Sequence, residues 1–161
     1  MPSAVTKTIA GFIAGFLAVV IFHQAMYFLI QTLGLPLQGK PWNFDADKAA
    51  YGMPRVVNQA FWGGLWGIAY AFMVDYIPGG MGWLKGFIFG MIFPMLIGSW
   101  LVVAMIKGTP LFSGAMAKGG FDIMALRNGF LLNGVAFGIG LGLIYPLLAG
   151  MLPGGARAQR A

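Results

Sequence analysis

Cysteine and glutamate are absent from this sequence of 161 residues, and histidine occurs once, at His23. Without cysteine the chain has no disulfide, no thiolate metal site, no iron–sulfur cluster and no cysteine nucleophile. One histidine is too few for a bis-histidine haem or a typical zinc site within one chain. Ligation of a haem by His23 and one of the 11 methionines stays formally open, but we expect no metal and no cofactor.

Charge is also scarce. Charged residues make up 9% of the chain, whereas an average soluble domain carries about 25%. The four acidic residues are all aspartate, so an ion-paired, water-facing surface is excluded, and with 59% hydrophobic residues the expected solvent is lipid. The net charge of +6 comes from Lys and Arg that stand singly at the ends of apolar runs. This placement is typical of membrane spans, and we expect no nucleic-acid binding.

Four apolar runs reach the length of about 20 residues that a helix needs to cross the hydrocarbon core of a bilayer. They cover residues 8–33, 56–76, 83–106 and 128–152. Prolines bound most of these runs, where a missing N–H and a steric clash disfavour further helix. The first run is longer than the h-region of a signal peptide and lacks a clear cleavage site, so we expect it to be retained. The sequence predicts an all-α membrane protein with four transmembrane helices.

The sequence also repeats itself, because five landmarks recur in one order at offsets of 71–75 residues. They predict two tandem helical hairpins, 8–80 and 83–155, in a single membrane domain 1–161 that ends in a basic tail, 156–161. Each hairpin has both ends on one side, so the copies run parallel in a four-helix bundle with a pseudo-twofold axis along the membrane normal. The alternative explanation is that glycine-rich membrane helices are generally alike. The landmark pairs are Gly11–Gly15 with Gly86–Gly90, Gly34–Leu37 with Gly108–Leu111, Arg55 with Arg127, Gly63 and Gly67 with Gly134 and Gly138, and Ile77–Gly80 with Leu152–Gly155.

Each predicted span carries glycines at a spacing of four, which places them on one helix face. Close packing over small residues is a main source of helix association in lipid. We expect these faces to pack inside the bundle; the alternative is a homodimer contact. The glycines are Gly11 and Gly15, Gly63 and Gly67, Gly86 and Gly90, and Gly134, Gly138 and Gly142.

Polar residues of the spans gather in the half of the bundle that faces the two long loops, 34–54 and 108–126. Polar groups are costly in lipid and are therefore candidates for function. We predict a pocket on the pseudo-twofold axis, with His23 deepest and two arginines at its mouth, for a lipid head group, an anionic small molecule or a partner's polar side chain. The alternative is ordinary hydrogen bonding between helices. The candidate binding residues are His23, Gln24, Arg55, Asn58, Gln59, Arg127 and Asn133.

No catalytic residue is predicted, because no carboxylate lies in mid-span and no catalytic triad or phosphate-binding motif is present. We expect a non-catalytic subunit or accessory protein that packs against lipid, a larger membrane complex or itself. The alternative is an oligomeric small transporter or channel, which would need polar residues through to the opposite side of the membrane.

Three short motifs carry a family resemblance: Phe22-His23-Gln24, Phe61-Trp62-Gly63-Gly64 with Trp66-Gly67, and Leu132-Asn133-Gly134. They resemble a family of uncharacterised four-span proteobacterial inner-membrane proteins, over most of the chain. The resemblance implies a bacterial inner (plasma) membrane and supplies no activity. Basic residues are nearly equal in number on the two sides, but Arg157 and Arg160 just past a span favour cytoplasmic termini.

Overall fold

The computed structural model describes residues 3–46, 51–117 and 120–151, which are mostly helical. The first long helix comprises α1 (Ala4–Leu17), η1 (Ala18–His23) and α2 (Gln24–Thr32), and α3 (Arg55–Met73) follows it. The next comprises α4 (Gly82–Gly90), η3 (Met91–Val102) and α5 (Val103–Lys107), and the last comprises α6 (Ile123–Gly129), η5 (Phe130–Gly138) and α7 (Ile139–Met151). The segments η1, η3 and η5 are π-helical. The predicted landmark Leu152–Gly155 and the basic tail lie outside the described residues.

Short capping elements fix where the long helices begin and end. Ser3 accepts a hydrogen bond from the backbone N–H of Thr6 (3.1 Å) and so caps α1. Asp122 accepts one from the N–H of Met124 (2.8 Å), so the last helix starts at Ile123, before the predicted start at 128. α5 ends at Gly108, whose φ of 62° belongs to the left-handed region that glycine tolerates. Between α5 and α6 lie a 3₁₀ turn, η4 (Ser113–Ala115), and a small antiparallel pair, β1 (Met116–Ala117) and β2 (Gly120–Phe121).

Three helices are long and apolar enough to cross a membrane: Ala4–Thr32, Gly82–Lys107 and Ile123–Met151. They confirm the predicted apolar helices at 8–33, 83–106 and 128–152 as helical spans by length and composition. The fourth predicted span, 56–76, forms a helix as α3, but its composition does not establish it as a span. The cause lies in its sequence, since Asn58 and Gln59 interrupt the apolar residues in its first turns.

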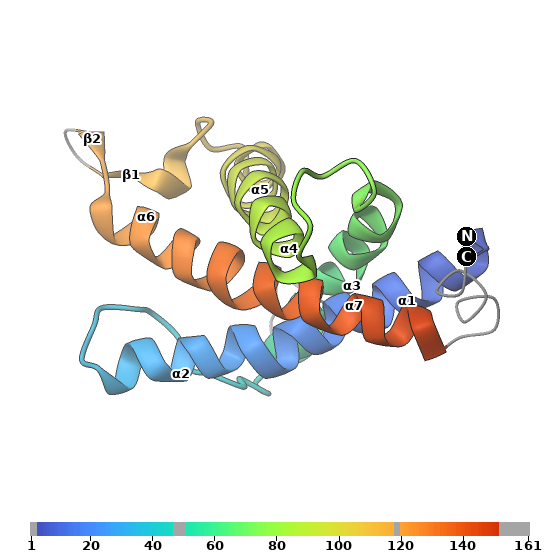
Figure 1. The fold of residues 1–161 in the computed structure, drawn as a ribbon. Coiled ribbons are helices and arrows are strands. Elements are labelled where there is room, and N and C mark those ends of the chain that lie inside the picture. Colours follow the sequence, from blue (N-terminus) through green and yellow to red (C-terminus); the bar gives the residue numbers. More distant parts are fainter. Residues whose placement is uncertain (1–2, 47–50, 118–119, 152–161) are drawn as a thin grey trace.

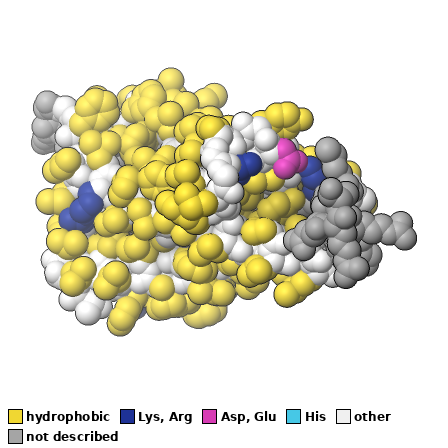
Figure 2. All heavy atoms as spheres, viewed as in Figure 1, with side chains coloured by type: hydrophobic (Ala, Val, Ile, Leu, Met, Phe, Trp, Pro, Cys, Tyr) yellow, Lys and Arg dark blue, Asp and Glu magenta, His cyan; other side chains and the backbone are white. Residues whose placement is uncertain are grey.

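The surface fits a membrane environment. Figure 2 shows that hydrophobic side chains cover most of the visible face, with Lys or Arg at its left end and further Lys or Arg, together with an acidic side chain, on its right half. Large apolar residues are exposed on every long helix, among them Phe28, Leu65, Ile92 and Leu147. An exposed apolar surface of this extent marks contact with lipid or protein.

The helices pack in a chain of neighbours. α1 lies along α3, the α6–α7 helix lies along α4, and α1 and α7 pack against each other. Figure 1 shows the α1–α2 and α6–α7 helices side by side, while the α4–α5 helix crosses them nearly along the line of sight. The largest buried cluster joins α1, α3, α4 and α7 and includes Tyr70, Phe89 and Leu141.

Glycine backbones form the two closest helix contacts. Between α1 and α3, a Cβ built on Gly11 would lie 2.5 Å from the carbonyl oxygen of Gly67, and Gly15 meets Gly63 in the same way. Between α4 and the α6–α7 helix, a Cβ on Gly138 would lie 2.5 Å from the carbonyl oxygen of Gly86. Because no side chain fits, these helices approach with backbone against backbone.

The second contact resembles the first at Gly138 and differs from it near Gly134. Gly138 meets Gly86 as Gly67 meets Gly11, and Gly142 meets Gly82 and Gly86. Gly90 meets Asn133 and Gly138, as Gly15 meets Gly63 and Gly67. Gly134 itself faces the side chains of Met91 and Phe87, so it does not belong to the backbone contact.

Candidate functional site

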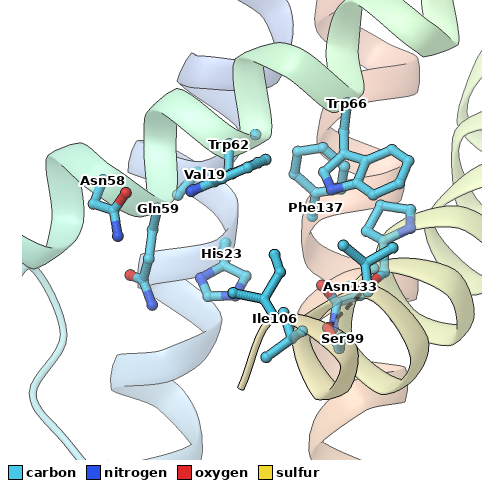
Figure 3. Close-up of a pocket in the computed structure, with 15 residues that line it drawn as sticks. Val19, His23, Asn58, Gln59, Trp62, Trp66, Ser99, Ile106, Asn133 and Phe137 are labelled. Atoms are coloured by element: carbon cyan, nitrogen blue, oxygen red, sulfur yellow. Dashed lines mark hydrogen bonds between the residues drawn. The ribbon is translucent and has the colours of Figure 1, made fainter. Parts of the chain in front are cut away.

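A cavity of about 370 Å³ lies between α3 and the η3–α5 segment (Figure 3). Small-molecule sites span about 300–1,000 Å³, so this volume lies at the lower end of their range. η1 and η5 form the floor, where Val19 and Phe137 are buried. The lining residues are Val19, His23, Asn58, Gln59, Trp62, Gly63, Trp66, Pro94, Gly98, Ser99, Val102, Val103, Ile106, Asn133 and Phe137.

The cavity exists because α3 and the α4–α5 helix touch at one end only. At the short-loop end Tyr70 packs edge-on against Phe89, with ring centroids 5.2 Å apart, and Lys85 donates a hydrogen bond to the carbonyl of Val74 (2.9 Å). The indole of Trp66 closes this end, since it lies against the backbone of Gly98. Toward the long loops the two helices separate, and the cavity occupies the space between them.

Four of the predicted binding residues line this cavity: His23, Asn58, Gln59 and Asn133. Figure 3 shows Asn58 and Gln59 on α3, His23 on η1 and Asn133 on η5. His23 and Asn133 both lie in π-helical segments, which are frequent at functional sites. The side-chain amides of Asn58 and Asn133 border the cavity, and in the described part of the chain no buried side-chain nitrogen or oxygen lacks a hydrogen-bond partner.

Gln24 lies outside the cavity and joins three segments behind it. Its side chain is 1% exposed. Its amide nitrogen donates to the side-chain oxygen of Gln59 (3.0 Å) and lies 3.4 Å from Nδ1 of His23. Its oxygen accepts from the backbone N–H of Trp42 (2.8 Å). Gln24 thereby links the first helix to α3 and to the first long loop.

Arg55 and Arg127 do not stand at the mouth of the cavity, which corrects the predicted position of both. Arg127 donates to the carbonyl oxygen of Pro36 (3.0 Å) and to the side-chain oxygen of Asn128 (2.8 Å), so it holds the first long loop. Arg55 lies near Gly39, in the same loop. A guanidinium has several donors and can bond a backbone carbonyl, and the bond to Pro36 directs Arg127 to the loop.

The mouth of the cavity is apolar. It is framed by Trp62, Val103 and Ile106, which are 50%, 40% and 71% exposed. These residues, with Trp66, Ser99 and Phe137, were not among the predicted binding residues. A signal for two of them is present in the sequence, because Trp62 and Trp66 follow Asn58 at a spacing of four and so share its helix face.

Several lining residues stand in pairs 75 positions apart. Asn58 pairs with Asn133, Trp62 with Phe137, Val19 with Pro94, and His23 with Gly98. Among the glycine contacts, Gly11 and Gly15 correspond to Gly86 and Gly90 at this spacing, whereas Gly67 corresponds to Gly138, 71 positions later. The two halves of the chain thus supply similar positions to one cavity.

Fold, surface and cavity together define the class: a helical membrane protein with a cavity between its helices. Comparison with protein-family models, curated proteins and solved structures finds no match to this chain. The family resemblance of the three short motifs therefore stays a prediction.

Proposed function

We propose that this chain is a non-catalytic accessory protein of the bacterial inner membrane that holds an amphiphilic molecule of the bilayer in its cavity. The observation that carries the proposal is the arrangement of the lining, with hydrogen-bonding groups inside and an apolar mouth. Polar groups inside a membrane protein cost free energy unless they have partners. A bound polar group would supply partners for Asn58 and Asn133.

We also propose that α3 is a fourth span. At about 1.5 Å per residue, its 19 residues extend about 28 Å, close to the hydrocarbon thickness of about 30 Å. Its two interrupting polar residues, Asn58 and Gln59, line the cavity and avoid lipid. α3 packs backbone against backbone on α1, as the last helix packs on α4.

The absence of cysteine makes the topology directly testable. Single cysteines at Gln38, Gly80 and Thr109 would be labelled with a membrane-impermeant maleimide in whole cells and in lysed cells. With four spans, Gln38→Cys and Thr109→Cys react from one side and Gly80→Cys from the other. If Gln38→Cys and Gly80→Cys react from the same side, α3 does not span, and the four-span proposal is wrong. The same labels decide which side holds the long loops.

The duplication into two parallel hairpins is the third part of the proposal. It is supported by the glycine contacts, since Gly11 meets Gly67 as Gly86 meets Gly138. The lining residues Asn58 and Asn133 are 75 positions apart, as Gly11 and Gly86 are. A chance likeness of glycine-rich helices would not be expected to repeat these backbone contacts.

An accessory role is favoured over the alternative of a transporter or channel. The cavity ends on Trp66, and beyond it Tyr70, Phe89 and Tyr145 pack edge-on with centroids 5.2–5.6 Å apart. A conducting path would need polar or open lining through this region.

The binding proposal is tested by extracting the protein with its native lipids in polymer nanodiscs and identifying the retained small molecules by mass spectrometry. We expect a near-stoichiometric amphiphile with the parent and much less with Asn133→Leu. Leu147→Ala, changed at a residue that is 62% exposed, is the matched control and should retain it. Equal retention by parent and Asn133→Leu, with both proteins monodisperse, would refute binding in the cavity.

A further inference from the structure

We propose that the molecule held in this cavity carries an uncharged planar ring with carbonyl or hydroxyl oxygens, and enters from the bilayer with this ring first. The inference rests on the proposed binding function and specifies its ligand. It depends on the lack of charge in the lining, on its planar side chains, and on which lining residues lie at the floor and which at the mouth.

The lining carries no formal charge. None of the lining residues is Lys, Arg, Asp or Glu within the part of the chain that the structure describes. Arg55 and Arg127 lie at the first long loop, and Lys107, which follows Ile106 of the mouth, is not among the lining residues. An ionised head group without a counter-charge is strongly disfavoured inside a bundle. The polar part of the ligand is therefore neutral, in contrast to the anionic head group that the sequence left open.

The hydrogen-bonding groups suit oxygen atoms in particular. Amides of Asn58, Gln59 and Asn133 and the imidazole of His23 face the cavity from three helices. Each amide offers N–H donors, and a neutral imidazole offers a donor or an acceptor. Carbonyl oxygens accept from such donors, and hydroxyl groups both donate and accept.

Planar side chains surround the same space. Figure 3 shows the indoles of Trp62 and Trp66, the phenyl ring of Phe137 and the imidazole of His23 around the cavity. Aromatic rings favour offset-stacked or edge-to-face contacts with another ring. A flexible head group would bind these surfaces less favourably than a rigid ring, because it loses rotamer freedom on binding.

The direction of entry is set by burial. His23 and Asn133 belong to the floor segments and are partly buried, whereas Trp62 and Ile106 at the mouth are half-exposed or more. A molecule whose polar ring reaches the floor must leave its remaining part at the mouth. That part contacts lipid and is therefore an apolar tail.

The test uses decylubiquinone as the probe and the quenching of tryptophan fluorescence as the readout, with the protein in phosphatidylcholine nanodiscs. Collisional quenching in the bilayer rises without saturation, so the saturable component reports the cavity. We expect a saturable component in the parent, about tenfold weaker binding for His23→Leu and Asn133→Leu, as for the loss of a hydrogen bond, and a similar loss for Trp66→Leu. Trp83→Leu is the matched control, since Trp83 lies outside the lining, and should bind like the parent.

Competition separates this inference from the proposed function. Dodecanol carries a neutral head without a ring and dodecanoate a charged one, and we expect neither to displace decylubiquinone at equal concentration. If dodecanol displaces it equally well and Trp66→Leu binds normally, the cavity takes neutral amphiphiles and the ring is refuted alone. If dodecanoate competes better, the neutral head is refuted. If the parent shows no saturable quenching but retains a native amphiphile by mass spectrometry, the ring inference alone is refuted. If the parent shows no saturable quenching and retains no amphiphile, the proposed binding function is refuted as well.

Discussion

Adding one methyl group at Gly138 should separate two helices. A Cβ there would lie 2.5 Å from the carbonyl oxygen of Gly86, 3.0 Å from its carbonyl carbon and 3.1 Å from Cα of Phe87. All three atoms belong to backbone, which cannot rotate away as a side chain can. Ordinary contacts begin near 3.4 Å, so the helices must move apart by about 1 Å for Gly138→Ala to fit.

A separation of this size has a calculable consequence. A radial gap of about 0.5–1 Å forfeits a quarter to a half of the dispersion attraction between the atoms it separates. The loss extends along the whole contact, because Gly82, Gly90 and Gly142 lie in the same interface. Overpacking typically costs about 1–3 kcal/mol, and lipid does not oppose separation as water would. We expect Gly138→Ala to lower the free energy of unfolding by about 1–3 kcal/mol.

The matched control lies one turn away on the same helix. A Cβ at Gly134 meets the thioether of Met91, at the far end of a flexible side chain. Gly134→Ala gains the same helix propensity, about 0.5–1 kcal/mol, so the difference between the two variants isolates the backbone contact. Unfolding of both would be followed by circular dichroism during titration with sodium dodecyl sulfate in mixed micelles. If Gly138→Ala is as stable as Gly134→Ala, the close backbone contact does not exist and the reasoning is wrong.

Two further substitutions test how the loop and the cavity are held. Gln24→Leu removes the hydrogen bonds to Gln59 and Trp42 and leaves these partly exposed partners without them; we expect a loss of about 1–2 kcal/mol in the same titration, and a loss below about 0.5 kcal/mol would show that the network is not structural. Arg127→Ala removes the shorter of two hydrogen bonds to the carbonyl of Pro36, the other being donated by Asn128; we expect faster hydrogen exchange in the first long loop with little change in global stability, and unchanged exchange would contradict the proposed tether.

Features that depend on local pattern could be predicted from the sequence alone. Hydropathy located the three confirmed apolar helices, and a spacing of four located Gly11, Gly15 and their partners. The cost of polar groups in lipid singled out His23, Asn58 and Asn133, which the fold then brings to one cavity. These signals are visible in one segment at a time, so they need no knowledge of the tertiary arrangement.

Other features depend on how distant segments meet. The two arginines were expected at the pocket because their positions suit it, but the carbonyls that Arg127 binds belong to a loop whose path no local pattern fixes. The π-helical turn in η1 carries no proline and has no evident sequence signal. The role of Trp66 as the closed end of the cavity depends on Gly98 facing it from another helix.

The cavity itself arises because corresponding positions of the two proposed repeats carry different residues. In the proposed duplication, the close pairing of the first and last helices corresponds to a pairing of α3 with the α4–α5 helix. These two helices instead meet where Tyr70 packs against Phe89 and where Trp66 packs against Gly98, and the cavity lies between them beyond Trp66. His23 corresponds to Gly98, 75 positions later, so one half brings an imidazole to the centre where the other brings no side chain. The indole of Trp66 packs against Gly98, where a larger residue would place its side chain, and closes this end of the cavity. A symmetric bundle would close equally on both sides, whereas this one stays open on the side of Trp62 and Ile106. In the proposed function, this opening is the route by which the ligand enters from the bilayer.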